Sequence, residues 1–82
     1  MTKSLRSPRQ IQLQKRLAEA RAKAGLTQMQ LADKLHRPQS FVAKYEGGER
    51  RIDVVEFCEI AAALGADPVA LFQEFLGEKP QI

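Results

Sequence analysis

The chain has 82 residues, enough for one domain and close to the lower limit at which a hydrophobic core forms without disulfides or metal ions. It contains one Cys and one His, which excludes an intramolecular disulfide and a zinc cluster, so we expect no metal and no cofactor. No apolar run is long enough for a membrane span or for the core of a secretory signal, and we expect a protein of the reducing cytoplasm.

The charge is distributed unevenly along the chain. Residues 1–24 carry seven Lys and Arg against one acid, residues 52–82 carry one base against six acids, and the net charge is +3. This asymmetry predicts that the first three helices face a polyanion such as DNA. The alternative is ordinary solvated charge.

Residues 1–8 are mostly polar, which predicts a flexible basic arm. The compact domain is then expected at residues 9–76, with a short tail at 77–82. From Arg9 to Gly25, a typical C-cap, apolar residues recur at helical spacing and predict a helix of about four turns. These residues are Ile11, Leu13, Leu17, Ala20 and Ala24.

Two short helices are predicted next, and each begins near a glutamine, Gln28 or Gln39. Thr27 is a good N-cap for the first of them. The segment 36–38 separates the two helices, because a residue that precedes proline is disfavoured in the α region and proline suits the start of a new helix. Their separation by a short turn predicts a helix-turn-helix unit.

The second short helix has two different faces. Val42 and Tyr45 lie three residues apart and can dock inward, and the pair Gly47-Gly48 ends the helix. The outward positions are polar or small: Gln39, Ser40, Ala43 and Lys44. Such a nearly flat, hydrogen-bonding surface suits a DNA major groove.

Two more helices follow, the fourth capped by Asp53 and the fifth by Asp67. The fourth is expected to bury Val54, Val55, Phe57, Ile60, Ala61 and Leu64, with Cys58 as a small buried hydrophobe among them. The apolar residues of the fifth span an arc of roughly 160°, wider than the ~100° stripe that packs on one core. They are Val69, Leu71, Phe72, Phe75 and Leu76, and we expect another molecule to cover the surplus.

Between residues 12 and 72 the order and spacing of these segments resemble the phage-repressor family, also called the Cro/CI or Xre type. The matching segments are 17–21, 25–28, the run 26–46, 54–64, 65–68 and 69–72. The resemblance implies an all-α, compact five-helix fold in which the second and third helices form a helix-turn-helix.

The resemblance also implies which residues contact DNA. Gln39, Ser40, Ala43 and Lys44 would read bases: Gln can bond adenine at two atoms, and Lys can bond guanine or a phosphate. The resemblance implies a backbone contact from Gln28, and the place of Arg50 and Arg51 in the loop after Gly47-Gly48 favours phosphate contacts from both. Arg37 and Phe41 depart from the residues usual in the family and are expected to add backbone contacts. Phe41 has two alternative roles, because it would either touch a thymine methyl or sugar or fill a gap beside the second helix.

Three further residues have structural roles in this comparison. Family members pair an arginine late in the first helix with a glutamate at the end of the recognition helix, which implies an ion pair between Arg21 and Glu46 here. His36 stands where the family usually has Gly, and it tolerates a left-handed conformation at some cost.

The expected function is sequence-specific binding of double-stranded DNA by a homodimer that acts as a transcriptional regulator such as a repressor. The dimer would form through Leu71, Phe72, Phe75 and Leu76. An enzyme is not expected, because the chain lacks a Ser/His/Asp set, a phosphate-binding glycine loop and a metal cluster. The alternative is an antitoxin or adaptor-type interaction module whose main partner is a protein such as a toxin.

Overall fold

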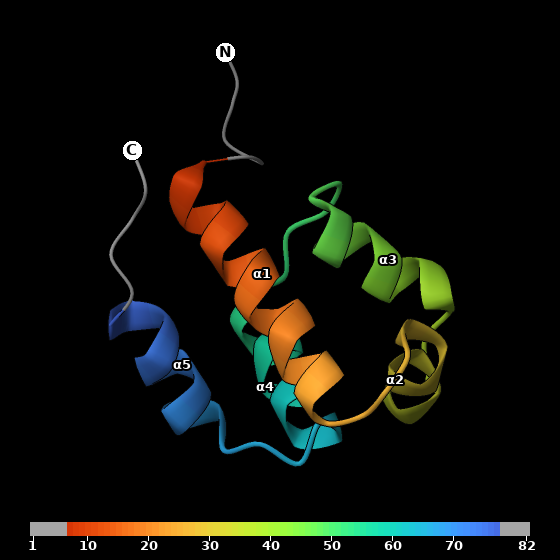
Figure 1. Ribbon diagram of the computed structural model, residues 1–82. Helices are drawn as coiled ribbons and strands as arrows, with labels where there is room; N and C mark the ends of the chain where they lie inside the picture. Colours follow the sequence, from red (N-terminus) through yellow and green to blue (C-terminus); the bar gives the residue numbers. More distant parts are fainter. Residues whose placement is uncertain (1–6, 78–82) are drawn as a thin grey trace.

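The computed structural model describes residues 7–77, and in that range it contains five α-helices and no strand. They are α1 (Pro8–Lys23), α2 (Gln28–Leu35), α3 (Gln39–Gly47), α4 (Val54–Ala63) and α5 (Pro68–Gly77). The predicted all-α, five-helix fold is therefore confirmed. In Figure 1, α1 crosses the middle of the molecule, with α2 and α3 on one side and α5 on the other. The expected arm and tail lie almost entirely outside the described residues.

Side chains close in sequence define the starts of three helices. Ser7 accepts a hydrogen bond from a backbone amide in the first turn of α1. Thr27 with Gln30, and Asp53 with Glu56, form complete capping boxes at the starts of α2 and α4. Because each cap is local, α2 and α4 begin where the sequence predicts.

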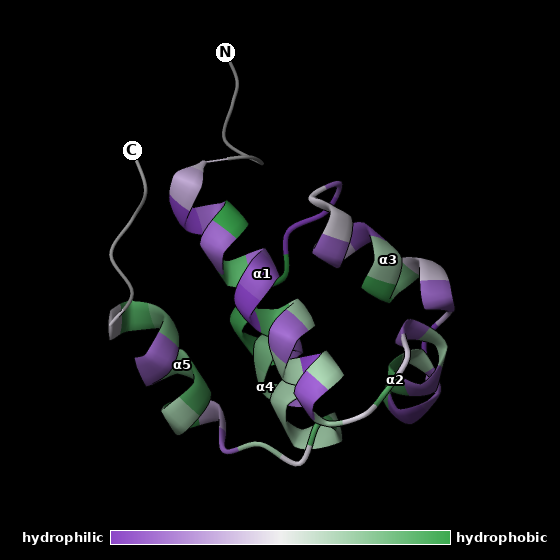
Figure 2. Cartoon of the chain, viewed as in Figure 1, coloured by the Kyte–Doolittle hydropathy of each residue, from purple (hydrophilic) through white to green (hydrophobic). Residues whose placement is uncertain are grey.

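The core contains residues from all five helices. Figure 2 shows that α4 and α5 are largely apolar, whereas hydrophilic residues recur along α1, α2 and α3. The buried apolar residues of the described chain are Leu17, Leu31, Ala32, Phe41, Val42, Tyr45, Ile60, Ala61 and Leu71. No helix within residues 7–77 is long and apolar enough to cross a membrane.

α4 buries fewer of its apolar residues than predicted. Val54 and Val55 are 78% and 65% exposed, and Cys58 is also exposed, so the prediction that these three side chains are buried is wrong. A helix of this length presents one stripe of about 100° to a core. Of the residues predicted to be buried, Phe57, Ile60 and Ala61 of α4 and its C-cap Leu64 share such an arc and pack on the core. Val55 and Cys58 fall outside that arc and remain at the surface.

The turn between α2 and α3 depends on a left-handed residue. His36 has φ 57° and ψ 41°, and it is the one non-glycine residue with positive φ in the described part of the chain. Its amide donates to the carbonyl of Asp33, and the next amide, of Arg37, donates to the carbonyl of Ala32. These bonds close α2 abruptly and allow α3 to begin at Gln39.

Replacing His36 with Gly is expected to stabilise the fold, because glycine adopts this conformation without the clash of a Cβ atom. A left-handed L-residue costs about 1 kcal/mol, and the greater freedom of an unfolded glycine offsets part of that gain. Urea unfolding measures the difference. His36→Ala keeps the Cβ atom and should show no gain. A glycine variant that unfolds at or below the wild-type urea concentration would contradict the argument.

Candidate nucleic-acid interface

The exposed side of α3 carries all four residues predicted to read bases. Gln39, Ser40, Ala43 and Lys44 are exposed, whereas Phe41, Val42 and Tyr45 on the other side of the helix are buried. α3 lies at the edge of the molecule beside α2 (Figure 1). The burial pattern thus leaves a polar helix face free for a groove-shaped partner.

A largely buried ion pair fastens α3 to α1. Arg21 Nε donates to Glu46 Oε2 at 2.8 Å, and Arg21 Nη2 donates to Glu46 Oε1 at 3.0 Å. Arg21 Nη1 also donates to the carbonyl of Leu26 at 2.9 Å. The hydrogen bonds to Glu46 raise the pKa of Arg21, so the guanidinium remains charged. The pair that the resemblance implies is therefore present, and it fixes the end of α3 against the scaffold.

Two glutamines connect this ion pair to the exposed face. Gln28 Nε2 donates to Glu46 Oε1 at 3.0 Å. Gln39 Nε2 in turn donates to Gln28 Oε1 at 3.4 Å. The two residues that begin α2 and α3 therefore meet through their side chains.

Phe41 does not lie on the exposed side of α3. Its side chain is buried, and its ring meets the ring of Tyr45 edge-on with 5.3 Å between centroids. The guanidinium carbons of Arg37 and Arg50 lie 4.3 and 4.9 Å from the Phe41 centroid. Burial under two cations stabilises the ring through dispersion and cation–π attraction. The expectation that Phe41 contacts the DNA backbone is corrected by this burial.

Arg50 is occupied by contacts within the protein. Its Nη1 and Nη2 donate to the two carboxylate oxygens of Glu56 at 3.1 and 2.9 Å, and Nη1 also donates to the carbonyl of Arg51 at 2.7 Å. The bonds from Arg50 to Glu56, together with one from the Asp53 amide, lower the pKa of Glu56. The expected phosphate contact from Arg50 therefore competes with a strong internal pair. The role of Glu56 was not predicted, although its capping-box spacing after Asp53 is a signal that indicates it.

Arg37 is held much less tightly. Its guanidinium nitrogens lie 3.6 Å from Glu56 and 3.8 Å from Glu59, beyond hydrogen-bonding distance, and its side chain is 36% exposed. The ring of Phe41 supports one side of the guanidinium. Arg37 is thus pre-positioned at the surface and retains donors for an anion.

The apolar surface predicted on α5 is shared with α4. Leu71 is buried in the domain's own core, which corrects the expectation that it belongs to a dimer interface. Phe72 and Leu76 are 44% and 54% exposed, and Phe75 is half-buried. A groove of about 580 Å³ runs between α4 and α5. Its apolar lining includes Leu13, Ile52, Val54, Phe57, Cys58, Val69, Phe72 and Leu76.

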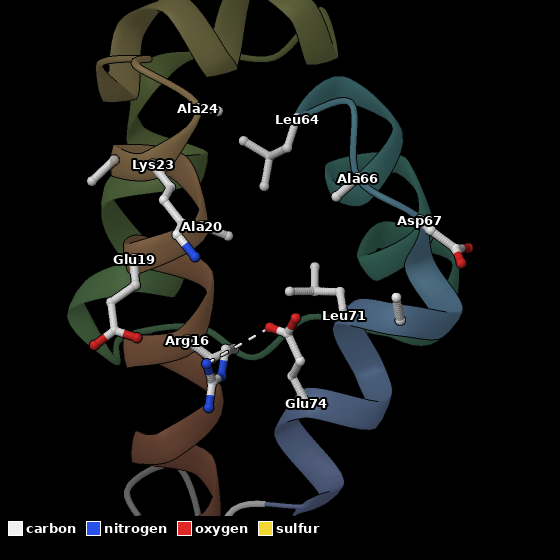
Figure 3. Close-up of a pocket in the computed structure, with 12 residues that line it drawn as sticks. Arg16, Glu19, Ala20, Lys23, Ala24, Leu64, Ala66, Asp67, Leu71 and Glu74 are labelled. Carbon is white, nitrogen blue, oxygen red and sulfur yellow. Dashed lines mark ion pairs between the residues drawn. The ribbon is translucent and has the colours of Figure 1, made fainter.

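A second groove, of about 750 Å³, lies between α1 and α5 (Figure 3). Ala20, Leu64 and Leu71 line its apolar part, and Arg16 reaches across it to Glu74 at 3.7 Å. This groove does not adjoin the exposed face of α3, because α3 and α5 lie on opposite sides of α1 (Figure 1). In the part of the chain that the structure describes, no three His, Cys, Asp or Glu side chains are grouped to hold a metal ion.

Known proteins resemble this chain in sequence and in fold. The family described as a helix-turn-helix domain matches residues 12–74. An XRE-family like protein from Pseudomonas syringae is 47% identical over 88% of both chains, with a TM-score of 0.81. The restriction-modification controller protein C.AhdI from Aeromonas hydrophila is 33% identical over 77% of this chain and 91% of its own, with a TM-score of 0.71.

Another restriction-modification controller protein, solved as a tetramer in complex with its natural 35 base-pair operator, shares the fold at 19% identity. It covers 83% of this chain and 90% of its own, with a TM-score of 0.76. No curated protein matches the chain. From the matched domain and the two more similar structures, the chain belongs to the XRE family of helix-turn-helix proteins, which are non-enzymatic DNA-binding transcription regulators.

Proposed function

We propose that the protein regulates transcription in the cytoplasm by binding specific operator sequences as a homodimer, with α3 in the major groove. The observation that carries this proposal is the exposed polar face of α3 on a helix fixed to α1 by Arg21 and Glu46. A rigidly held helix places its side chains reproducibly, which base recognition requires.

Gln39 and Lys44 offer the most chemistry for reading bases. The Gln39 amide can bond the N6 and N7 atoms of adenine, and the Lys44 ammonium can bond guanine. Ser40 can bond several bases, whereas Ala43 offers only a methyl group for apolar contact. Each good bidentate contact contributes about 1 to 3 kcal/mol of discrimination, so two such residues distinguish an operator half-site.

Phosphate contacts would orient the domain on the duplex. Gln28 stands at the N-terminus of α2, where backbone amides and the helix dipole favour an anion. Arg37 and Arg51 lie in the turns that precede and follow α3. Of the two guanidiniums beside Phe41, that of Arg37 is the better phosphate ligand because Arg50 already holds Glu56.

Binding to duplex DNA is expected to weaken steeply with salt, because each phosphate contact contributes a log-log slope of about −0.9. Gln39→Ala or Lys44→Ala should relax base preference, whereas Arg37→Ala should weaken all sequences alike and make the slope shallower by about 0.9. Fluorescence anisotropy over a salt series, with an operator selected from a random duplex pool, measures all three effects.

Arg50→Ala provides the contrast for Arg37→Ala. It removes the partner of the buried Glu56 carboxylate, so its main effect should be a lower free energy of unfolding rather than a shallower salt slope. If the wild-type protein retains no duplex at low salt, the proposed function is wrong.

Homodimer formation is supported by the apolar face of α4 and α5. Val54, Val69, Phe72 and Leu76 are all exposed and line the groove between these two helices, and soluble monomers rarely expose a large contiguous apolar patch. A twofold axis through this face would cover the patch in both copies. It would also present two recognition helices about 34 Å apart, one turn of the duplex.

Sedimentation at micromolar concentration is expected to show a species of twice the 9.2 kDa chain mass. Phe72→Glu should dissociate it, because a carboxylate would be desolvated at the centre of the apolar face. Met29→Glu is the matched control: Met29 is 50% exposed but lies on α2, so this variant should remain dimeric. A wild-type protein that sediments at the mass of one chain would rule out the dimer.

A further inference from the structure

The bonds that run from the ion pair to the surface of α3 give Glu46 a role beyond fastening the helix. We propose that Glu46 is a specificity-determining positioning residue, which sets the orientation of the Gln28 amide and, through it, that of the Gln39 amide. The inference rests on the proposed function, because it takes Gln39 to be a base-reading residue.

The Glu46 carboxylate is a fixed hydrogen-bond acceptor. Arg21 Nε and Nη2 occupy both of its oxygens at 2.8 and 3.0 Å, and the carbonyl of Leu26 holds the same guanidinium from another direction. The Glu46 side chain is only 7% exposed. An ionised carboxylate accepts hydrogen bonds and donates none, so any neighbour must approach it with a donor.

This acceptor determines which way the Gln28 amide points. Gln28 Nε2 donates to Glu46 Oε1 at 3.0 Å. The opposite orientation would place the Gln28 oxygen against a carboxylate oxygen and forfeit a charge-assisted hydrogen bond, which is stronger than one between neutral groups. Gln28 Oε1 is therefore the atom presented to Gln39.

The orientation of the Gln28 amide in turn determines that of the Gln39 amide on the exposed face of α3. Gln39 Nε2 donates to Gln28 Oε1 at 3.4 Å, whereas a flipped Gln39 amide would set two oxygens against each other. One N–H of Gln39 is thereby used, and one N–H and the oxygen remain for a base. That donor and acceptor complement the N7 and N6 groups of adenine. The Glu46 carboxylate, near the C-terminal end of α3, thus determines which atoms of the Gln39 amide face the DNA groove.

Two substitutions interrupt this series of hydrogen bonds at different places. Glu46→Gln replaces the obligate acceptor with a group that both donates and accepts, so both amides are free to take either orientation. Gln28→Met removes the amide that links Glu46 to Gln39 and leaves the ion pair between Arg21 and Glu46 intact. Glu49→Gln makes the same chemical change three residues beyond Glu46, at an exposed residue, and serves as the matched control.

The measurement is selection of bound sequences from a random duplex pool with the wild type, these three variants and Gln39→Ala. Gln39→Ala identifies the base position that Gln39 reads. At that position, Glu46→Gln and Gln28→Met should each lower the adenine preference by about tenfold, within the range that one bidentate base contact provides. The other positions, including the one read by Lys44, should keep their preferences, and Glu49→Gln should match the wild type throughout.

The outcomes separate this inference from the proposed function. The readout compares bases within one bound population, so a smaller folded fraction in the Glu46 variant does not change it. Profiles of Glu46→Gln and Gln28→Met that equal the wild type would overturn the inference and leave the proposed function standing. An equal loss of base preference at every position would also overturn the inference, because that pattern reflects a displaced α3. A wild type that selects no base would contradict the proposed function and the inference together.

Discussion

The ion pair between Arg21 and Glu46 decides where the reading helix sits. Its partners are 25 residues apart in sequence and belong to α1 and α3, so it closes a large part of the chain into one rigid unit. Because both side chains are mostly buried, removing either would leave the other charge without its partner, at a cost of about 3 kcal/mol. A domain of this size has a total stability of only about 5 to 15 kcal/mol, so the position of α3 and the integrity of the fold are strongly coupled.

The opposite end of α3 is held by a different kind of contact. The ring of Phe41 lies between the core, where it meets Tyr45, and two guanidiniums at the surface. One of these, Arg50, continues through Glu56 to the first turn of α4. The C-terminal end of α3 is therefore fixed to α1, and its N-terminal end is fixed to α4. The helix needs little further ordering when a partner binds, which lowers the entropic cost of binding.

Local signals explain why so much of the fold was predictable. Thr27 and Asp53 cap their helices through neighbours three residues away, and such signals are visible in the sequence. Burial on α4 was not predictable in the same way, because the side of an apolar helix that faces the core depends on which helices pack against it; Cys58 is the clear example. The same holds for the site. The exposed face of α3 follows from helical periodicity, whereas the burial of Phe41 and the engagement of Arg50 depend on contacts between separate elements.

The alternation of exposed and buried residues along α3 has an evolutionary consequence. Exposed positions such as Ser40, Ala43 and Lys44 contribute little to packing, and substitutions at such positions usually change stability by less than about 0.5 kcal/mol. Duplicated copies of this gene can therefore drift toward new operators at these positions without passing through unfolded intermediates. Gln39 differs from them, since its amide is bonded to Gln28 and through it to the ion pair. Its identity should diverge more slowly than that of its neighbours, and related regulators should share the base it reads while differing at the rest of the site.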